Sequence, residues 1–197
     1  MGVLLIYINV DLCKVNNVAM FGNKETGIIT FYYDSDKLFN DVSLMSAYMT
    51  KNLKNESGSA MDEFSISDDE KGIYDVCVRQ TLPNIYETMI KITSGVDNAF
   101  DDNVEVKSQE NGSLNRKVGT YIEFTMQDNE AYNENILSLV DATLLNCLKH
   151  GILAEFYSIC VNADLYRISQ DRFTTSLFQL KQRLFQLKKK AVSSQLS

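Results

Sequence analysis

The clearest hydrophobic pattern lies between Asn133 and Lys190, where two helical repeats follow one another. In the first repeat, apolar residues recur at every fourth position from Ile136 to Cys160. That spacing keeps them on one slowly turning face of a helix. Further apolar residues widen this face beyond a single stripe, as expected of a helix that is contacted from more than one side. We therefore predict that a helix from about Asn133 to Cys160 is the central and most buried element.

The second repeat follows a short polar break at residues 161–164. Its apolar positions alternate at intervals of four and three residues: Phe173, Leu177, Leu180, Leu184 and Leu187. Alternation of this kind is typical of a helix that packs lengthwise on a partner helix. The nearest partner is the preceding helix, so the two are expected to form an αα-hairpin.

A third long helix is predicted from about Asp68 to Thr93. Ser67 and Glu70 have the spacing of a capping box, which marks the start of a helix, and Gly95 follows its expected end. Pro83, the single proline of the chain, falls inside the pattern. Because proline removes one backbone hydrogen bond, we expect it to kink this helix or to divide it in two.

The remaining segments are shorter. One amphipathic helix is expected at Asp41–Leu53, followed by a surface loop at Lys54–Met61. Alternating and β-branched residues predict strands at these positions: Gly2–Val10, Ile28–Tyr33, Val104–Val106 and Lys117–Met126, the last two joined as a hairpin around Gln109–Arg116. Short strands separated by helices have little sheet to join within one chain, so they need either the helical core or a neighbouring subunit to cover them, and we expect them to become better ordered as arms that pair with a neighbouring subunit.

These elements predict an α+β fold that is mainly helical, with a core of long helices, a C-terminal αα-hairpin and short β arms. The 197 residues suit one domain. Within it, residues 1–61 would form the N-terminal arm region and short helix. Residues 62–197 would form the helical core, with a β-hairpin insertion around residues 103–126.

The distribution of charge adds an asymmetry. The formal net charge is −7, which disfavours a general nucleic-acid binder. Residues 56–134 hold 17 acidic and 6 basic residues, whereas residues 164–197 hold 2 acidic and 7 basic ones. Such a division suits a subunit that meets copies or partners of opposite sign, although a solvated acidic surface accounts for it equally well.

Candidate chemistry is sparse. The four cysteines have no close pair, which favours buried free thiols in a reducing cytoplasm over a metal or redox site. His150 is the single histidine and has no nucleophile motif near it, so we expect it to pack on a helix. Asp97, Asp101 and Asp102 lack the calcium-loop pattern and are expected to be solvated. We therefore expect no enzyme activity, no cofactor and no bound metal. No apolar run is long enough to indicate a membrane span.

Several stretches together resemble the head-to-tail connector proteins of tailed bacteriophages, among them ring proteins of crAss-like and related podovirus-like phages. The resemblance lies in the order of these pieces: Phe64–Lys71 opening a helix, the β segment Tyr121–Phe124, the aromatic helix end Glu155–Tyr157, the turn Ala163–Tyr166, and a basic helix ending in Lys188–Lys190. It is a likeness of pattern and carries no catalytic signature.

The resemblance implies a structural virion protein, assembled in the host cytoplasm, that forms a dodecameric neck ring below the portal and joins the capsid to the tail. Its partners would be copies of itself, the portal protein and other neck or tail rings, with genomic DNA passing through the channel without specific binding and no membrane. The candidate interface residues are Ile28, Phe31, Tyr33, Tyr121, Phe124, Lys188, Lys189 and Lys190. The alternative is a small helical regulatory or nucleic-acid- or protein-binding module, with a basic face formed by Arg172, Lys181, Arg183 and Lys188–Lys190.

Overall fold

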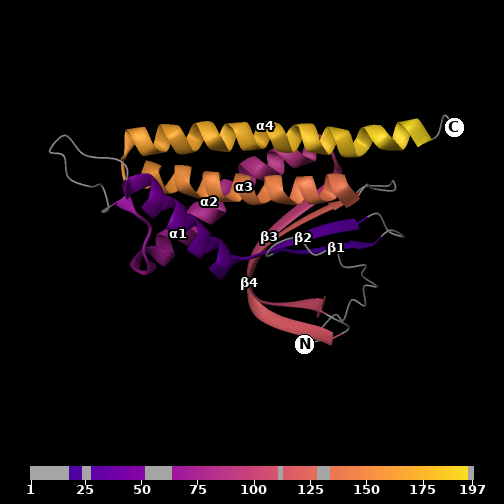
Figure 1. Ribbon diagram of the computed structural model, residues 1–197, viewed down its shortest axis with the longest axis horizontal. Coiled ribbons are helices and arrows are strands. Elements are labelled where there is room, and N and C mark those ends of the chain that lie inside the picture. The colour runs from indigo at the N-terminus through magenta and orange to yellow at the C-terminus, as the bar shows by residue number, and fades with distance from the viewer. Residues whose placement is uncertain (1–17, 24–27, 52–63, 111–112, 128–133, 195–197) are drawn as a thin grey trace.

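The computed structural model describes residues 18–23, 28–51, 64–110, 113–127 and 134–194, although within these ranges some side chains, including those of residues 188–194, are not described. The fold is α+β and mainly helical, as predicted (Figure 1). The strands are β1 (Val18–Asn23), β2 (Ile28–Asp34), β3 (Ser94–Glu110) and β4 (Ser113–Gln127). The helices are α1 (Ser35–Lys51), the 3-10 turn η2 (Asp68–Glu70), α2 (Lys71–Ile90), α3 (Glu134–Ile159) and α4 (Ala163–Ser194).

The helix α3 is the central element of the helical layer. It packs against α2, against α1 and, over most of its length, against α4, which lies along its outer side (Figure 1). Leu144, Leu148 and Ile152 on its apolar row have no solvent exposure. The predicted central helix and αα-hairpin are therefore confirmed. By length and composition alone, Ile136–Ile159 is apolar enough to cross a membrane, but core helices meet the same criterion and 56% of its most apolar stretch is buried within the fold.

The helix α2 begins as the capping box predicts and continues through its proline. The backbone N–H of Ser67 donates to Glu70 Oε2 at 2.8 Å, and the N–H of Glu70 donates to the Ser67 carbonyl at 3.0 Å. Downstream, Lys71–Ile90 is one helix with Pro83 inside it, so the chain is not divided there. Pro83 lies on the exposed side, where water can solvate the carbonyl that loses its helical partner.

The helix α1 begins six residues before the predicted start, directly after β2. Asp34 Oδ1 accepts a hydrogen bond from the backbone N–H of Lys37 at 3.2 Å, which caps the first turn. The predicted loop at Lys54–Met61 and the predicted strand at Gly2–Val10 lie outside the described residues.

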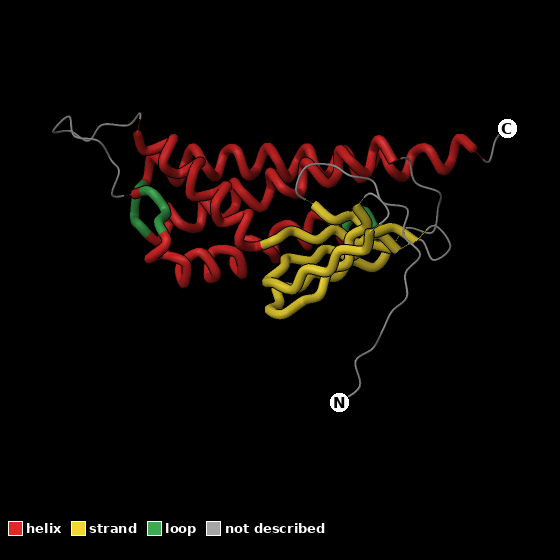
Figure 2. Tube along the Cα trace, turned by 60° about the horizontal axis from the view of Figure 1, so that its bottom comes forward, coloured by secondary structure: helices red, strands yellow, loops and turns green. Residues whose placement is uncertain are grey.

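The strands form one antiparallel sheet in the order β1-β2-β4-β3, on one side of the helices (Figure 2). Alternate residues of β2 and β4 face the helices and pair across the strands: Ile29 with Met126, Phe31 with Phe124, and Tyr33 with Ile122. All six are at most 1% exposed and belong to the same hydrophobic cluster as the helices. Burying an apolar side chain of this size contributes about 1.5–3 kcal/mol.

This sheet corrects the prediction that the β segments are separate arms awaiting a neighbour. Ile28–Asp34 pairs with Tyr121–Gln127 within the same chain, although almost ninety residues separate them in the sequence. The prediction failed because it treated sequence distance as spatial distance. Only the outer part of the β3–β4 hairpin extends beyond this sheet.

Candidate interface surfaces

Four of the aromatic residues predicted for an interface are internal to the chain. Phe31, Tyr33 and Phe124 lie in the hydrophobic core, and Tyr121 is also buried, with its ring edge-on to that of Tyr32 at 6.4 Å between centroids. These assignments were wrong, because Phe31, Tyr33 and Phe124 are covered by the chain's own helices and Tyr121 packs on Tyr32 of the neighbouring strand. Ile28, at the start of β2, is exposed.

The three lysines of the predicted basic end, Lys188–Lys190, lie on α4, and their side chains are outside the described set. The helix backbone is described there, and it extends past the N-terminal end of the antiparallel α3 (Figure 1). These residues therefore lie on the C-terminal part of a helix, as predicted. Their contacts with a neighbouring subunit stay a prediction.

The β3–β4 hairpin is the main protruding feature. β2 pairs with β4 only along Tyr121–Gln127, whereas β3 and β4 continue to pair from Val104 opposite Gly119 to Glu110 opposite Ser113. At about 3.3 Å per residue, this outer ribbon is roughly 20 Å long. We call residues 104–119 the arm. A two-stranded ribbon of this kind is only marginally stable alone.

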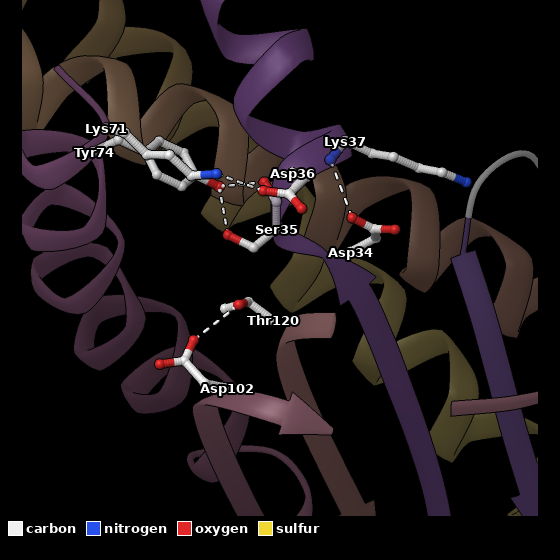
Figure 3. A network of polar contacts seen from close by, with 8 residues as sticks. All are labelled: Asp34, Ser35, Asp36, Lys37, Lys71, Tyr74, Asp102 and Thr120. Atoms are coloured by element: carbon white, nitrogen blue, oxygen red, sulfur yellow. Dashed lines mark hydrogen bonds and ion pairs between the residues drawn. The ribbon is translucent and has the colours of Figure 1, made fainter. Parts of the chain in front are cut away.

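The base of the arm is held by polar contacts. The register shifts between Asp101 and Val104, and at this position Thr120 Oγ1 donates to Asp102 Oδ1 at 2.8 Å (Figure 3). Figure 3 also shows the junction of β2, α1 and α2, where Lys71 forms an ion pair with Asp36 at 2.7 Å and the Tyr74 hydroxyl donates to the Ser35 carbonyl at 3.1 Å. The arm therefore continues directly from the paired strands of the sheet across this register shift.

The outer side of α4 carries exposed aromatic residues. Phe178 is 60% exposed and Phe185 is 46% exposed. They are seven residues apart, or two helical turns, so they lie on one stripe, with exposed Lys181 and Gln182 between them. On α1, Leu44 and Tyr48 form a second exposed apolar pair one turn apart. The predicted seam of α4 faces α3, and the exposed phenylalanines on its other side were not anticipated.

The turn between α3 and α4 is a third exposed apolar feature. Val161 is 88% exposed and has φ of 56°, in the left-handed region that a β-branched residue rarely adopts. The N–H of Asn162 donates to the Tyr157 carbonyl and the N–H of Val161 to that of Ser158, a pattern that usually has glycine at this position. Asn162 Oδ1 then accepts from the N–H of Leu165 and caps α4.

Burial changes the pKa values of several described cysteines and of the single histidine. Burial raises the pKa of the Cys77 and Cys147 thiols to about 12, so both are protonated and poor nucleophiles at neutral pH. Burial, and then the charges of Arg172 and Lys149, lower the pKa of His150, which is half-buried on α3 and therefore neutral. Among the described residues, no group of three or more His, Cys, Asp or Glu side chains is placed to hold a metal ion.

One buried carboxyl group is unusual. Asp141 on α3 is 5% exposed, and its Oδ1 accepts a hydrogen bond from the Tyr33 hydroxyl of β2 at 2.9 Å. Burial raises the pKa of Asp141 to about 6, and the hydrogen bond from Tyr33 opposes this shift. The pair links the sheet to the central helix, and its surroundings give it a structural role.

The exposed apolar features are therefore the pair Leu44 and Tyr48 on α1, the outer side of α4 and the α3–α4 turn. The arm extends beyond the sheet, and of its described side chains Val118 is exposed and Val106 is buried. Comparison of the chain with protein-family models, with curated proteins and with solved structures found no match.

Proposed function

We propose that this protein is a structural, non-enzymatic subunit of a bacteriophage head-to-tail connector, where it forms a dodecameric ring between the portal and the tail. The observation that carries the proposal is the arm, a two-stranded ribbon roughly 20 Å long that leaves the sheet at a register shift. No third strand pairs with the arm among the described residues. A ribbon of this size is stabilised when another chain covers it.

The exposed aromatic residues of α4 support the same proposal. A closed ring requires two different surfaces on each subunit, which match one another around the ring. Phe178 and Phe185 provide an apolar stripe on the helical side of the molecule, and the arm extends from its sheet side (Figure 1). Aromatic side chains are enriched at the centres of protein interfaces.

The test is capture of the chain by its proposed partner. The full-length protein, co-expressed with a phage portal protein, should co-purify with it through a sizing column in one high-mass peak. A variant with Phe178→Ser and Phe185→Ser is the matched probe of the α4 stripe, because both side chains are exposed and their loss should leave the fold intact. Failure of the wild-type chain to associate either with itself or with the portal would contradict the proposal.

A charge-reversal variant tests the basic end of α4. Replacing Lys188, Lys189 and Lys190 with Glu should weaken assembly more at low salt than at high salt, because salt already screens attractions between exposed charges. Assembly that is indifferent to both the reversal and the salt concentration would exclude these lysines as interface residues.

The second candidate function is a small binding module that uses the basic residues of α4. Arg172 and Lys181 are exposed on that helix, which favours an acidic partner or a nucleic acid. This alternative predicts a monomer or dimer that binds an oligonucleotide with steep salt dependence. A ring-sized particle without such binding would exclude it.

A further inference from the structure

The outer edge of β3 is open in the described fold. β3 is the last strand in the sheet order, and along Ser94–Asp101 it pairs with β4 on one side only. Asp97 and Asp101 lie on this strand and are exposed. They are four residues apart, so they share the face of the sheet turned away from the core. Residues 94–102 contain three acidic residues and no basic one, which makes this an acidic edge.

A second open edge lies on the arm and has the opposite charge. The edge of β4 that β2 occupies along Tyr121–Gln127 has no partner among the described strands along Ser113–Gly119. This segment contains Arg116 and Lys117 and no acidic residue, and we call it the basic edge. It is seven residues long, comparable to the nine residues of the acidic edge.

The two edges cannot pair with each other within one chain. They lie on opposite sides of the same hairpin, since one belongs to the outer side of β3 and the other to the side of β4 that faces away from β3. Charged residues on an edge strand discourage pairing with arbitrary strands. A strand of opposite charge is attracted to such an edge and not repelled by it, so the charges favour pairing between an acidic edge and a basic edge.

We infer that the basic edge of one copy's arm adds as a strand to the acidic edge of β3 in the next copy. This inference rests on the proposed ring and names the contact that closes it. The interface is head-to-tail, because each copy offers one edge of each kind. Such an interface propagates from copy to copy until the ring closes. Backbone hydrogen bonds supply attraction, and the charges set the choice of edge.

The decisive experiment uses two charge-reversed chains. In the first, Arg116→Glu and Lys117→Glu make both edges acidic; in the second, Asp97→Lys and Asp101→Lys make both edges basic. Each variant alone should lose most of its assembly at low salt, with association weakened about tenfold or more. The two variants mixed in equal amounts should assemble again, because acidic arms then meet basic β3 edges and basic arms meet acidic ones. Light scattering after size exclusion measures each sample.

A matched control carries the same change of charge elsewhere. Lys51→Glu with Arg167→Glu alters two exposed residues at the C-terminal end of α1 and the N-terminal end of α4, away from the sheet (Figure 1). This control should assemble as the wild type does. Circular dichroism and thermal melting of every variant confirm that each one is folded.

Three outcomes overturn the inference: reversed variants that assemble as the wild type does, folded variants that fail to assemble when mixed, or a control that loses as much assembly as they do. If another part of the same chain covers the arm, the reversed variants should assemble as the wild type does. A wild-type chain that stays monomeric at all concentrations overturns the proposed ring itself, which separates failure of the function from failure of this contact.

Discussion

Gly151 on α3 lies close to both α2 and α4, and the packing of these three helices leaves no room there for a side chain. A Cβ atom at this residue of α3 would lie 2.4 Å from Thr81 Cγ2 on α2 and 3.0 Å from Phe173 Cε2 on α4. Carbon atoms in contact normally lie about 3.5–4.0 Å apart. Rotation about the Cα–Cβ bond of Thr81 would move Cγ2 aside, but it would also break the hydrogen bond that the Thr81 hydroxyl donates to the Cys77 carbonyl at 2.8 Å. Replacing Gly151 with Ala therefore either costs this buried hydrogen bond or forces α2 and α3 apart.

The expected cost follows from two opposing terms. Alanine is favoured over glycine inside a helix by about 1 kcal/mol. Overpacking a close-packed core costs about 1–3 kcal/mol, and a separation of 2.4 Å to Thr81 Cγ2, whose rotation away would break a buried hydrogen bond, places Gly151→Ala at the upper end. We expect the variant to lose about 2 kcal/mol in its free energy of unfolding.

Two further variants separate the steric effect from the helix preference. A Cβ atom at Gly72, in the first turn of α2, would meet no atom within 4 Å, so Gly72→Ala should gain up to about 1 kcal/mol. Thr81→Ser removes Cγ2 and keeps the hydroxyl that donates to the Cys77 carbonyl at 2.8 Å. The double variant Gly151→Ala with Thr81→Ser should therefore recover part of the loss, with a coupling of about 0.5–3 kcal/mol.

Urea unfolding followed by circular dichroism at a fixed protein concentration measures these differences, because assembly makes apparent stability depend on concentration. If Gly151→Ala is as stable as the wild type, or if Thr81→Ser gives no recovery, the three helices do not approach one another as described.

Three other variants test separate contacts. Asp141→Asn keeps an acceptor for the Tyr33 hydroxyl and removes a buried charge. The pKa of Asp141 is about 6 in the folded state and near 3.9 in the unfolded state, so the wild-type carboxyl lowers the free energy of unfolding as the pH rises from about 4 to 6. The variant should gain about 3 kcal/mol over the wild type at pH 7 and little at pH 4 in urea titrations, and a pH-independent difference would contradict this assignment. Val161→Gly should raise the melting temperature by relieving the left-handed strain, worth up to about 1 kcal/mol, and a lower melting temperature would show that Val161 is not strained. Leu144→Ala should lose about 2–5 kcal/mol, since Leu144 is fully buried on the central helix, and an unchanged melting temperature would contradict its place in the core.

The long helices could be predicted because their signals are local. The apolar row from Ile136 to Cys160 predicted a helix at Asn133–Cys160, and the structure has it at Glu134–Ile159. The capping box at Ser67 and Glu70 predicted the start of the next long helix equally well. Repeats and caps of this kind depend on neighbours within a few residues, which the sequence displays directly.

The sheet could be predicted only in part, because its signals are not local. β3 spans 17 residues, whereas the sequence indicated only a short strand at Val104–Val106. Its Asp and Asn residues suggested a loop, but they suit an edge strand with one face in solvent, and pairing with β4 overrides their low β propensity. The burial of Phe31 and Phe124 depends on a pairing across more than ninety residues, which no local pattern reveals.

The accessible surfaces were likewise predicted in part. The hairpin around Gln109–Arg116 was predicted, and the last described pair of β3 and β4, Glu110 with Ser113, falls within it. The exposure of Phe178 and Phe185 was missed, because a helical repeat gives the buried face without showing whether another element covers the opposite one. Gly151 gave no signal at all, since its importance lies in the approach of α2 and α4.

The particle mass of the purified full-length chain tests the central claim most directly. Mass photometry over a range of concentrations, followed by electron microscopy of the main peak, gives both copy number and symmetry. The account predicts a closed ring of roughly 270 kDa, twelve times the 22.4 kDa of one chain. A species that remains at the mass of one or two chains under every condition, with and without the portal protein, would contradict it.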